Sequence, residues 1–246
     1  MKKENAVAVV TGSARNIGRA TALNLATQGY HILLHTRNDV ENLERSVALI
    51  KETGVQCKAV TGPLNDISVI NEIRETAHSI GPCQVLVNNA SVRKTKPFLQ
   101  ITLDEWHEVF QINCDAQFLC TQAFLPDMLK EKWGRVICLG GLSAHTGAAE
   151  RAAVVTSKSS IPGLVRALAV EFAGSNVTFN CVVPGHIEVE RSKDTGARLK
   201  HPKFQGQQVL YGKPADVARI ISMLTGPDSN FVTGQTIHVN GGAYLP

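Results

Sequence analysis

Short apolar runs that end at turn residues alternate along the chain with longer segments in which apolar residues recur at helical spacing. The apolar runs predict seven strands: Val7–Val10, His31–His35, Gln56–Val60, Val85–Asn88, Arg135–Leu139, Val177–Val183 and Thr236–Val239. The periodic segments predict six helices: Ile17–Gln28, Val40–Thr53, Ser68–Ser79, Leu103–Leu129, Ala152–Phe172 and Ala215–Leu224. This alternation predicts an α/β fold, with a parallel sheet covered by helices on both faces.

One segment breaks the alternation. Residues His186–Gly212 are polar, contain Gly and Pro and have no regular period, so we expect a long loop before the last helix. Ligands of wound sheets bind beyond the carboxyl ends of the strands, where this loop starts. Its basic side chains suggest an anionic substrate, although a solvated loop is the simpler interpretation: Arg191, Lys193, Arg198, Lys200 and Lys203.

Composition narrows the class of protein. The chain has 246 residues, of which 43% are hydrophobic and 19% charged, and we expect one globular domain over residues 1–246. The apolar run after MKKEN is too short for a signal peptide or a membrane span. Six scattered cysteines predict reduced thiols, no metal site and a cytoplasmic location. A net charge of +4, without a basic and aromatic run, disfavours nucleic acid and membrane partners.

The segment VAVVTGSARNIGRATALNLA, from residue 7 to 26, predicts a strand, a tight turn and the start of a helix. Free backbone N–H groups and the helix dipole would favour a pyrophosphate there. Gly12 and Gly18 stand where a side chain would block the turn or the approach of a phosphate. Asn16 replaces the usual middle glycine, and asparagine tolerates a left-handed backbone. Taken alone, such a loop also fits an ordinary strand-to-helix turn.

The end of the second strand bears on the choice of cofactor. An acidic residue there would bind the ribose 2′-OH of NAD, whereas an arginine accommodates a 2′-phosphate. This chain has Thr36, Arg37 and Asn38, and Arg15 lies in the glycine loop. Two guanidinium groups near one phosphate favour NADP(H) over NAD(H). The alternative is that both arginines are solvated surface residues.

Five motifs in order resemble those of the short-chain dehydrogenase/reductases and together cover nearly the whole chain. They are TGSARNIG, LVNNAS, PGHI, YGKPADVA and TGQTIHVNGGA, which start at residues 11, 86, 184, 211 and 233. The resemblance implies a three-layer Rossmann fold with a doubly wound, seven-stranded parallel sheet and a nicotinamide cofactor. It also implies a homo-oligomer, a tetramer or a dimer, built through the long fourth and fifth helices.

The resemblance and the loop chemistry together give a set of expected cofactor contacts. These are Gly12, Ser13, Arg15, Asn16, Ile17, Gly18, Thr36, Arg37, Asn38, Leu64, Asn89, Ala90, Lys158, Pro184, Gly185 and Ile187. Leu64 matches the apolar residue beside the adenine, but the acidic residue that usually precedes it is replaced by Pro63. Because proline has no side-chain acceptor for the adenine amino group, this departure predicts weaker cofactor binding.

The catalytic pattern of the family is only half present. The family uses an Asn, a Ser, and the Tyr and Lys of a YxxxK motif. Asn113 and Lys158 match the Asn and the Lys, whereas the Ser position is Gly141 and the Tyr position is Val154. Neither glycine nor valine has a side-chain proton to give. The sequence therefore predicts that the usual proton-transfer groups are absent.

Two histidines are candidates for the missing donor. An imidazole ordinarily titrates near neutrality, so His145 could act as acid or base, although a solvated loop histidine is the simpler interpretation. His186 follows the PG turn. We expect an NADP(H)-dependent oxidoreductase for a small carbonyl or alcohol substrate, with a proton from the substrate, from water, or from His145 or His186. The alternatives are a catalytically inactive NADP(H)-binding regulator or partner subunit, and a lyase or isomerase that uses Lys158.

Overall fold

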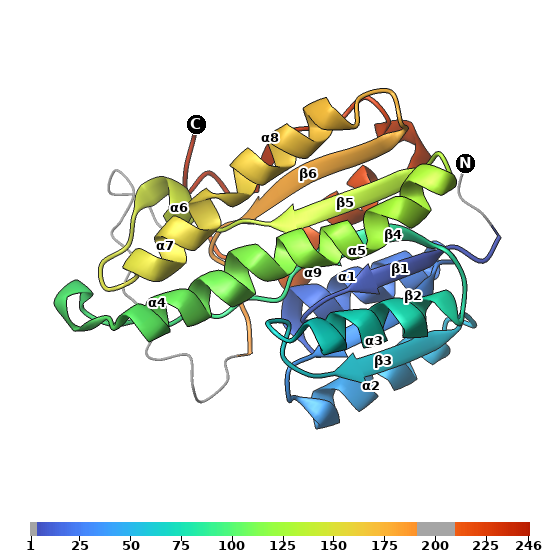
Figure 1. Ribbon diagram of the computed structural model, residues 1–246, viewed down its shortest axis with the longest axis horizontal. Coiled ribbons are helices and arrows are strands. Elements are labelled where there is room, and N and C mark those ends of the chain that lie inside the picture. The colour runs from blue at the N-terminus through green and yellow to red at the C-terminus, as the bar shows by residue number, and fades with distance from the viewer. Residues whose placement is uncertain (1–3, 191–209) are drawn as a thin grey trace.

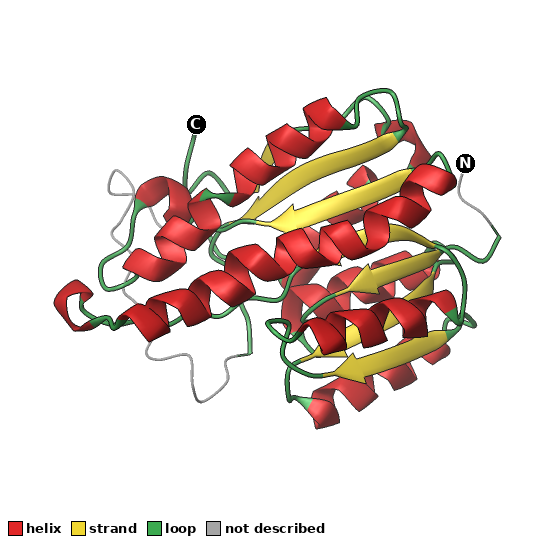
Figure 2. Ribbon diagram, in the orientation of Figure 1, coloured by secondary structure: helices red, strands yellow, loops and turns green. Residues whose placement is uncertain are grey.

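The computed structural model describes residues 4–190 and 210–246, so the five basic loop residues between 191 and 203 lie outside the described part. A seven-stranded parallel sheet has the order β3-β2-β1-β4-β5-β6-β7 (Figure 2). Its strands are β1 (Val7–Val10), β2 (His31–Thr36), β3 (Cys57–Thr61), β4 (Cys83–Asn88), β5 (Gly134–Leu139), β6 (Val177–Pro184) and β7 (Thr236–Val239). The predicted doubly wound α/β sheet is confirmed, and its strand order reverses beside β1.

Helices cover both faces of this sheet and make three layers (Figure 1). One layer contains α1 (Asn16–Thr27), α2 (Val40–Lys51) and α9 (Pro214–Leu224), and the other α3 (Ile67–His78), α5 (Ala116–Lys130) and α8 (Ile161–Glu171). Successive residues of β1 point to opposite faces: Val7 and Val9 join the core under α3, α5 and α8, and Ala8 and Val10 the core under α1, α2 and α9. Burial on both sides explains why β1 is continuously apolar.

The predicted helix Leu103–Leu129 is interrupted at the position of a candidate catalytic residue. It consists of α4 (Leu103–Phe110), a π-helical turn (Gln111–Asp115) and α5. The π turn contains Asn113, and such turns insert one residue into a helix, which changes the direction of the side chains. Apolar periodicity predicts the helix but not this local change.

The predicted helix Ala152–Phe172 is divided in two. Helix α7 (Ala152–Ser159) ends just before α8, because Pro162 in the first turn of α8 has no N–H group for the preceding turn. Three further elements were too short to predict: α6 (Ser143–Thr146) and the 3₁₀ turns Phe98–Gln100 and Pro227–Ser229. The two ends of the predicted loop meet, since Ile187 pairs with Gly212. Within the described residues, none of the helices is both long and apolar enough to cross a membrane.

Candidate functional site

The glycine turn lies at the carboxyl end of β1 and is locked to the end of β4. The Thr11 hydroxyl accepts hydrogen bonds from the backbone N–H groups of Asn89 (3.0 Å) and Ala90 (3.1 Å). In return, the side-chain amide of Asn89 donates to the backbone carbonyls of Thr11 (2.9 Å) and Gly12 (2.8 Å). The structure therefore brings two expected cofactor contacts, Asn89 and Ala90, directly against the turn.

Close contacts inside the turn require its two glycines. Gly12 has a φ of +63°, and a Cβ atom there would lie 2.8 Å from the Cα atom of Ala90. A Cβ atom at Gly18 would lie 2.3 Å from the carbonyl oxygen of Gly12. Any other residue would force the turn open. Asn16 has a φ of +53°, which confirms the left-handed backbone expected where the family has its middle glycine.

Helix α1 presents the N–H groups of its first turn at this point. Arg15 is its N-cap residue, and no side chain at this position caps the helix N–H groups. The Arg15 guanidinium pairs with Asp39. Ile17 is buried beneath the turn, and the backbone N–H of Ser13 donates to the carbonyl of His35 at 2.8 Å. Uncapped N–H groups at the positive end of a helix dipole suit a pyrophosphate.

Asn16 also connects two segments that are far apart in the sequence. Its side-chain amide donates to the carbonyl of Glu190 at 2.9 Å and accepts from the N–H of Glu190, also at 2.9 Å. Glu190 follows the PG turn at the end of β6. The phosphate turn is thereby joined to the segment on the expected nicotinamide side.

The residues expected at the 2′-phosphate lie together at the end of β2. Thr36 is buried at the strand end, and Arg37 and Asn38 are exposed just beyond it. The Nε atom of Arg15 lies 3.5 Å from a carboxylate oxygen of Asp39, with both side chains partly exposed. Asp39 was not expected at this site from the sequence, and an incoming phosphate would compete with its carboxylate for Arg15.

A histidine that sequence reasoning overlooked supports the turn from behind. The Nδ1 atom of His35 accepts from the N–H of Gly12 (3.4 Å), while Nε2 donates to the carbonyl of Gly62 (2.8 Å). Burial lowers the pKa of His35, so the ring is neutral with one donor and one acceptor nitrogen. The carbonyl that it contacts precedes Pro63 and the buried Leu64, where the adenine contact is expected.

At the catalytic end, Lys158 and Asn113 are connected by a buried network. The ammonium of Lys158 donates to the carbonyl of Leu139 at 2.6 Å. The side-chain amide of Gln117 donates to that same carbonyl (3.4 Å) and to the carbonyl of Asn113 (2.9 Å). Burial, and to a smaller extent the positive charge of Arg93, lowers the pKa of Lys158 to about 8. Gln117, one helical turn beyond Asn113, carried no signal in the sequence.

Asn113 holds the loop that follows β4. Its side-chain oxygen accepts from the N–H of Val92 at 2.9 Å, and its side-chain amide donates to the carbonyl of Val92 at 3.1 Å. The same amide donates to the hydroxyl of Ser157 (3.2 Å), which immediately precedes Lys158. Asn113 thus positions both the loop after β4 and the helix that carries the lysine.

The two substituted positions lie beside this network. A Cβ atom at Gly141 would lie 3.8 Å from the Cγ atom of Lys158, which is an ordinary contact. Val154 is 4% exposed and belongs to an apolar cluster with Val92, Trp106, Val109 and Ala153. Val154 is therefore part of an apolar wall, and a side chain at residue 141 would be in ordinary contact with the stem of Lys158.

The rings of the two candidate histidines contact other aromatic side chains. The ring of His145 packs against His238 (4.6 Å between centroids) and Tyr244 (5.3 Å), so it contacts β7 and the C-terminal tail. Burial lowers the pKa of His145. His186 lies 5.8 Å from the ring of Tyr211 and lines a hollow of about 310 Å³ toward β7.

The PG turn is placed by the edge of the sheet. Pro184 is the last residue of β6, and the N–H of Gly185 donates to the carbonyl of Val239 at 2.9 Å. Ile187 then forms its bridge with Gly212. These contacts set the PG turn at the carboxyl ends of the strands, on the same edge as the glycine turn.

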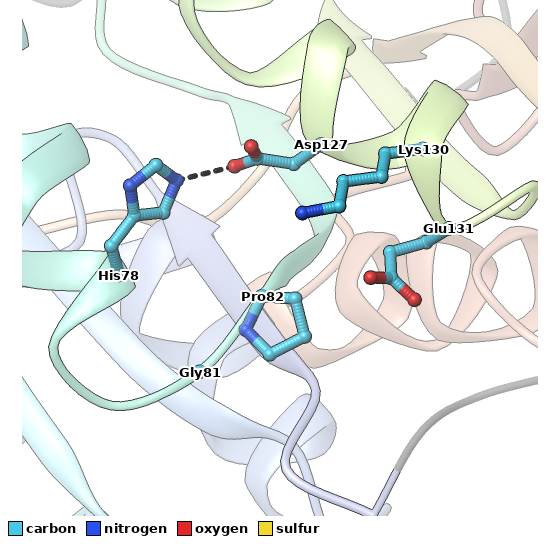
Figure 3. A pocket seen from close by; sticks show the side chains of 6 residues that line it. All are labelled: His78, Gly81, Pro82, Asp127, Lys130 and Glu131. Atoms are coloured by element: carbon cyan, nitrogen blue, oxygen red, sulfur yellow. Dashed lines mark hydrogen bonds and ion pairs between the residues drawn. The ribbon is translucent and has the colours of Figure 1, made fainter.

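A second, polar hollow lies at the opposite edge of the sheet. It measures about 340 Å³, and Figure 3 shows its lining residues, among them Asp127 and Lys130 at the end of α5, Glu131 directly after it, and Gly81 and Pro82. Asp127 forms an ion pair with His78 of α3. Because Pro82 immediately precedes β4, this hollow is at the amino ends of the strands, away from the edge where wound sheets bind ligands.

Comparisons with known proteins agree with this architecture. A family model described as "Enoyl-(Acyl carrier protein) reductase" matches residues 12–244. The chain is 32% identical to the 3-oxoacyl-[acyl-carrier-protein] reductase FabG of Staphylococcus aureus, across 97% of this chain and 98% of the relative. It is 33% identical to the enzyme of that name from Aquifex aeolicus, across 99% of each. The chain therefore belongs to the short-chain dehydrogenase/reductase family.

Another relative and two solved structures extend the comparison. A Thauera aromatica protein, (2S)-[(R)-hydroxy(phenyl)methyl]succinyl-CoA dehydrogenase subunit BbsD, is 31% identical over 98% of both chains. A blue fluorescent protein from a metagenomic library, solved in complex with NADPH, is 30% identical, with a TM-score of 0.88 over the whole of both chains. The acetoin dehydrogenase YohF of Salmonella typhimurium, at 24% identity and a TM-score of 0.84 over 97% and 95% of the chains, shows the shared fold.

Proposed function

We propose that the protein is an NADP(H)-dependent oxidoreductase that reduces a small carbonyl compound, or oxidises the corresponding alcohol, without a tyrosine or serine as proton donor. When bound, NADPH supplies the hydride. The residues of this chain bind and orient the reactants and supply the proton.

The cofactor would fit the turn described above. The first-turn N–H groups of α1 would hold the pyrophosphate, and Arg15, Arg37 and Asn38 would contact the 2′-phosphate. Asn89 and Ala90, with the PG turn at Pro184, Gly185 and Ile187, would line the nicotinamide half. The NADPH in the blue fluorescent protein and the reductase names of the relatives support this assignment.

The observation that carries the proposal is the buried network around Lys158. Its ammonium stays hydrogen-bonded to Leu139 and linked through Gln117 to Asn113, although tyrosine and serine are missing beside it. A pKa of about 8 suits a group that gives a proton near neutral pH. We therefore assign the missing role of proton donor to Lys158, acting directly or through one water, in preference to His145 and His186.

The test is a pair of measurements on the purified protein. Calorimetry should show NADPH binding more tightly than NADH, and the absorbance of NADPH should fall when carbonyl compounds are added. The rate should be lower than that of tyrosine-containing relatives by about 10²- to 10⁴-fold, the usual cost of losing a general acid. Failure to bind either cofactor, or complete absence of turnover across a broad panel of ketones and aldehydes, would overturn the proposal.

A second candidate is an inactive NADP(H)-binding partner subunit. Val154 is packed into an apolar cluster, as expected of a position released from catalysis, and one relative is named as a subunit of a dehydrogenase. This candidate predicts NADPH binding without turnover, together with co-purification of a tyrosine-containing homologue. Turnover by the isolated chain would exclude it.

We also propose that the protein is a homo-oligomer, a tetramer or a dimer. Large apolar side chains are exposed on and next to α4 and α5, where the family builds its interface: Phe98, Leu99, Leu103 and Phe118. Burying such side chains between copies would remove apolar surface from water. Light scattering of the purified chain would give its mass, and a monomer would refute this proposal.

A further inference from the structure

His35 lies where two backbone segments of the expected cofactor site meet. It belongs to β2 and is 1% exposed. Its Nδ1 atom accepts from the N–H of Gly12 in the glycine turn, and its Nε2 atom donates to the carbonyl of Gly62, directly after β3. Gly62 precedes Pro63 and Leu64, where the adenine contact is expected. One ring thus joins the turn expected at the phosphates to the segment expected at the adenine.

The backbone around this ring is held in place on both sides. The N–H of Ser13 donates to the carbonyl of His35 at 2.8 Å, and the N–H of His35 donates to the hydroxyl of Ser13 at 2.9 Å. On the other side, the N–H of Gly62 donates to the carbonyl of Thr36 at 3.0 Å. A Cβ atom at Gly62 would lie 2.6 Å from a methyl carbon of Val69 in α3. A change in the ring would therefore act directly on its two hydrogen bonds.

The chemistry of the two partners fixes the protonation state of the ring. A backbone carbonyl can only accept, so Nε2 carries a proton, and a backbone N–H can only donate, so Nδ1 carries none. A proton added to Nδ1 would point at the N–H of Gly12, whose nitrogen is 3.4 Å away, and that hydrogen bond would be lost. Burial lowers the pKa of His35 from its ordinary 6.5, so the ring gains this proton only in acid.

The ring of His35 titrates without a charged neighbour among the described residues. Its pKa is lowered by burial and raised in part by the hydrogen bond to Gly62. His35 faces the same side of the sheet as Leu33, which packs in the core under α3. The charged residues of the adjoining elements are either bound to other partners or exposed: Arg15 (with Asp39), Lys58 of β3 (with Ser79), Asp66 (with Ser68), and Glu72, Arg74, Glu75 and His78 of α3.

We propose that His35 is a positioning residue for the dinucleotide: the neutral ring holds the glycine turn and residues 62–64 in place, and protonation of the ring releases the turn and weakens binding. This inference rests on the proposed function and adds a dependence of cofactor affinity on pH. Because Pro63 has no side-chain acceptor for the adenine, this segment contributes through its backbone position, which His35 helps to hold.

The experiment is calorimetry with NADP⁺ from about pH 5 to about pH 8, the range in which imidazoles titrate. Asparagine at residue 35 keeps an acceptor near Gly12 but does not titrate, and leucine keeps neither bond. At the upper pH, His35→Leu should bind NADP⁺ about three- to tenfold more weakly than wild type, the worth of a hydrogen bond, with His35→Asn between them. As the pH falls through the pKa of His35, wild-type affinity should approach that of His35→Leu.

The ratio of affinities between variants isolates the effect of the ring. The 2′-phosphate also titrates, with a pKa of about 6, but it does so equally in every variant. The ratio of His35→Asn to His35→Leu should therefore stay constant with pH, whereas the ratio of wild type to His35→Leu should fall in acid. His31→Gln is the control, because His31 lies on the same strand and contacts Gln56 instead. It should keep the wild-type profile. A constant ratio of wild type to His35→Leu would overturn the inference.

Nitrogen NMR of the protein without cofactor separates this outcome from that of the proposed function. At neutral pH, Nδ1 of His35 should be unprotonated and Nε2 protonated, and the amide signal of Gly12 should move as the ring titrates. If these signals behave so but NADP⁺ does not bind, the proposed function is overturned and the role of His35 in holding the turn stands. A proton on Nδ1 at neutral pH, or an unresponsive Gly12 amide, would overturn the inference whatever the cofactor does. Thermal melting at each pH checks that every variant is folded.

Discussion

The glycine turn, where the phosphates are expected, and the surroundings of Lys158, where catalysis is expected, depend on different kinds of interaction. At the phosphate end, the turn depends on backbone contacts so close that Gly12 and Gly18 have no substitute, and Asn89 locks the turn to β4. At the catalytic end, Gly141 borders open space and Val154 fills an apolar cluster. The glycine motif is thus needed for folding as well as for binding. Its presence says less about activity than the residues near Lys158 do.

Lys158 is the more informative residue because the fold does not need its charge. Asn113 has a structural role, since it holds Val92 and Ser157. A buried ammonium with a pKa of about 8 instead costs stability, on the order of 3 kcal/mol at neutral pH. In the proposed function, the lysine offsets this cost by acting in the chemistry or by holding the cofactor.

The strongest test of this difference between the two ends is to introduce the family's serine and tyrosine beside Lys158. The double variant Gly141→Ser and Val154→Tyr should raise kcat/KM for NADPH-dependent ketone reduction by about 10²- to 10⁴-fold, because it restores a general acid beside Lys158. Serine fits at residue 141 without a close contact, whereas tyrosine must displace part of the Val154 cluster. Gly141→Ser alone is the matched control and should change the rate little. No gain in a folded double variant would mean that the rest of the pocket no longer accepts a ketone.

Removing the charge of Lys158 should separate stability from activity. Lys158→Met should abolish NADPH oxidation and raise the free energy of unfolding at pH 7 by up to about 3 kcal/mol, since a buried ammonium is replaced by an apolar chain. Chemical denaturation gives the free energy of unfolding, and NADPH absorbance gives the rate of oxidation.

The difference in free energy of unfolding between the wild type and Lys158→Met should change with pH in one direction. The pKa of Lys158 is about 8 in the folded protein and ordinarily 10.5, so between these values the unfolded chain binds more protons. The penalty is therefore complete below pH 8 and disappears as the pH rises toward 10.5. The wild type should gain stability relative to Lys158→Met over that interval. A constant difference across it would show that the ammonium is not destabilised by burial.

The phosphate end can be weakened by single charges. Arg37→Gln and Arg15→Gln should each reduce the preference for NADPH over NADH by about tenfold, the worth of one charge-assisted hydrogen bond, with little change in NADH binding. Asp39→Asn should have the opposite effect, because it frees Arg15 from its ion pair. Calorimetry gives the dissociation constants of each variant for NADPH and NADH. An equal loss of affinity for both cofactors would place the arginines away from the 2′-phosphate.

Apolar alternation was sufficient to predict the sheet and its order of elements. It predicts all seven strands to within two residues, because each is a short run bounded by turn residues. The π turn at Asn113 and the break before Pro162 depend on local hydrogen bonding that apolar spacing does not record.

In the candidate site, matching motifs located Asn113 and Lys158, and the structure joins them. His35, Gln117 and the Asp39 pair were missed because they act through contacts between residues distant in the chain.

The smallest expected effect concerns the connection between the two ends. Asn16→Gly keeps the left-handed backbone without strain but removes both hydrogen bonds to Glu190. Because these bonds join the phosphate turn to the segment beyond the PG turn, their loss should speed NADPH dissociation by about three- to tenfold, with the stability of the fold unchanged. Asn16→Ala removes the same bonds and also strains a backbone with positive φ, so it should lower stability by about 1 kcal/mol as well. Stopped-flow release of NADPH distinguishes the variants. Equal rates for Asn16→Gly and wild type would show that Asn16 serves only the backbone of the turn, and that the two ends bind their parts of the cofactor independently.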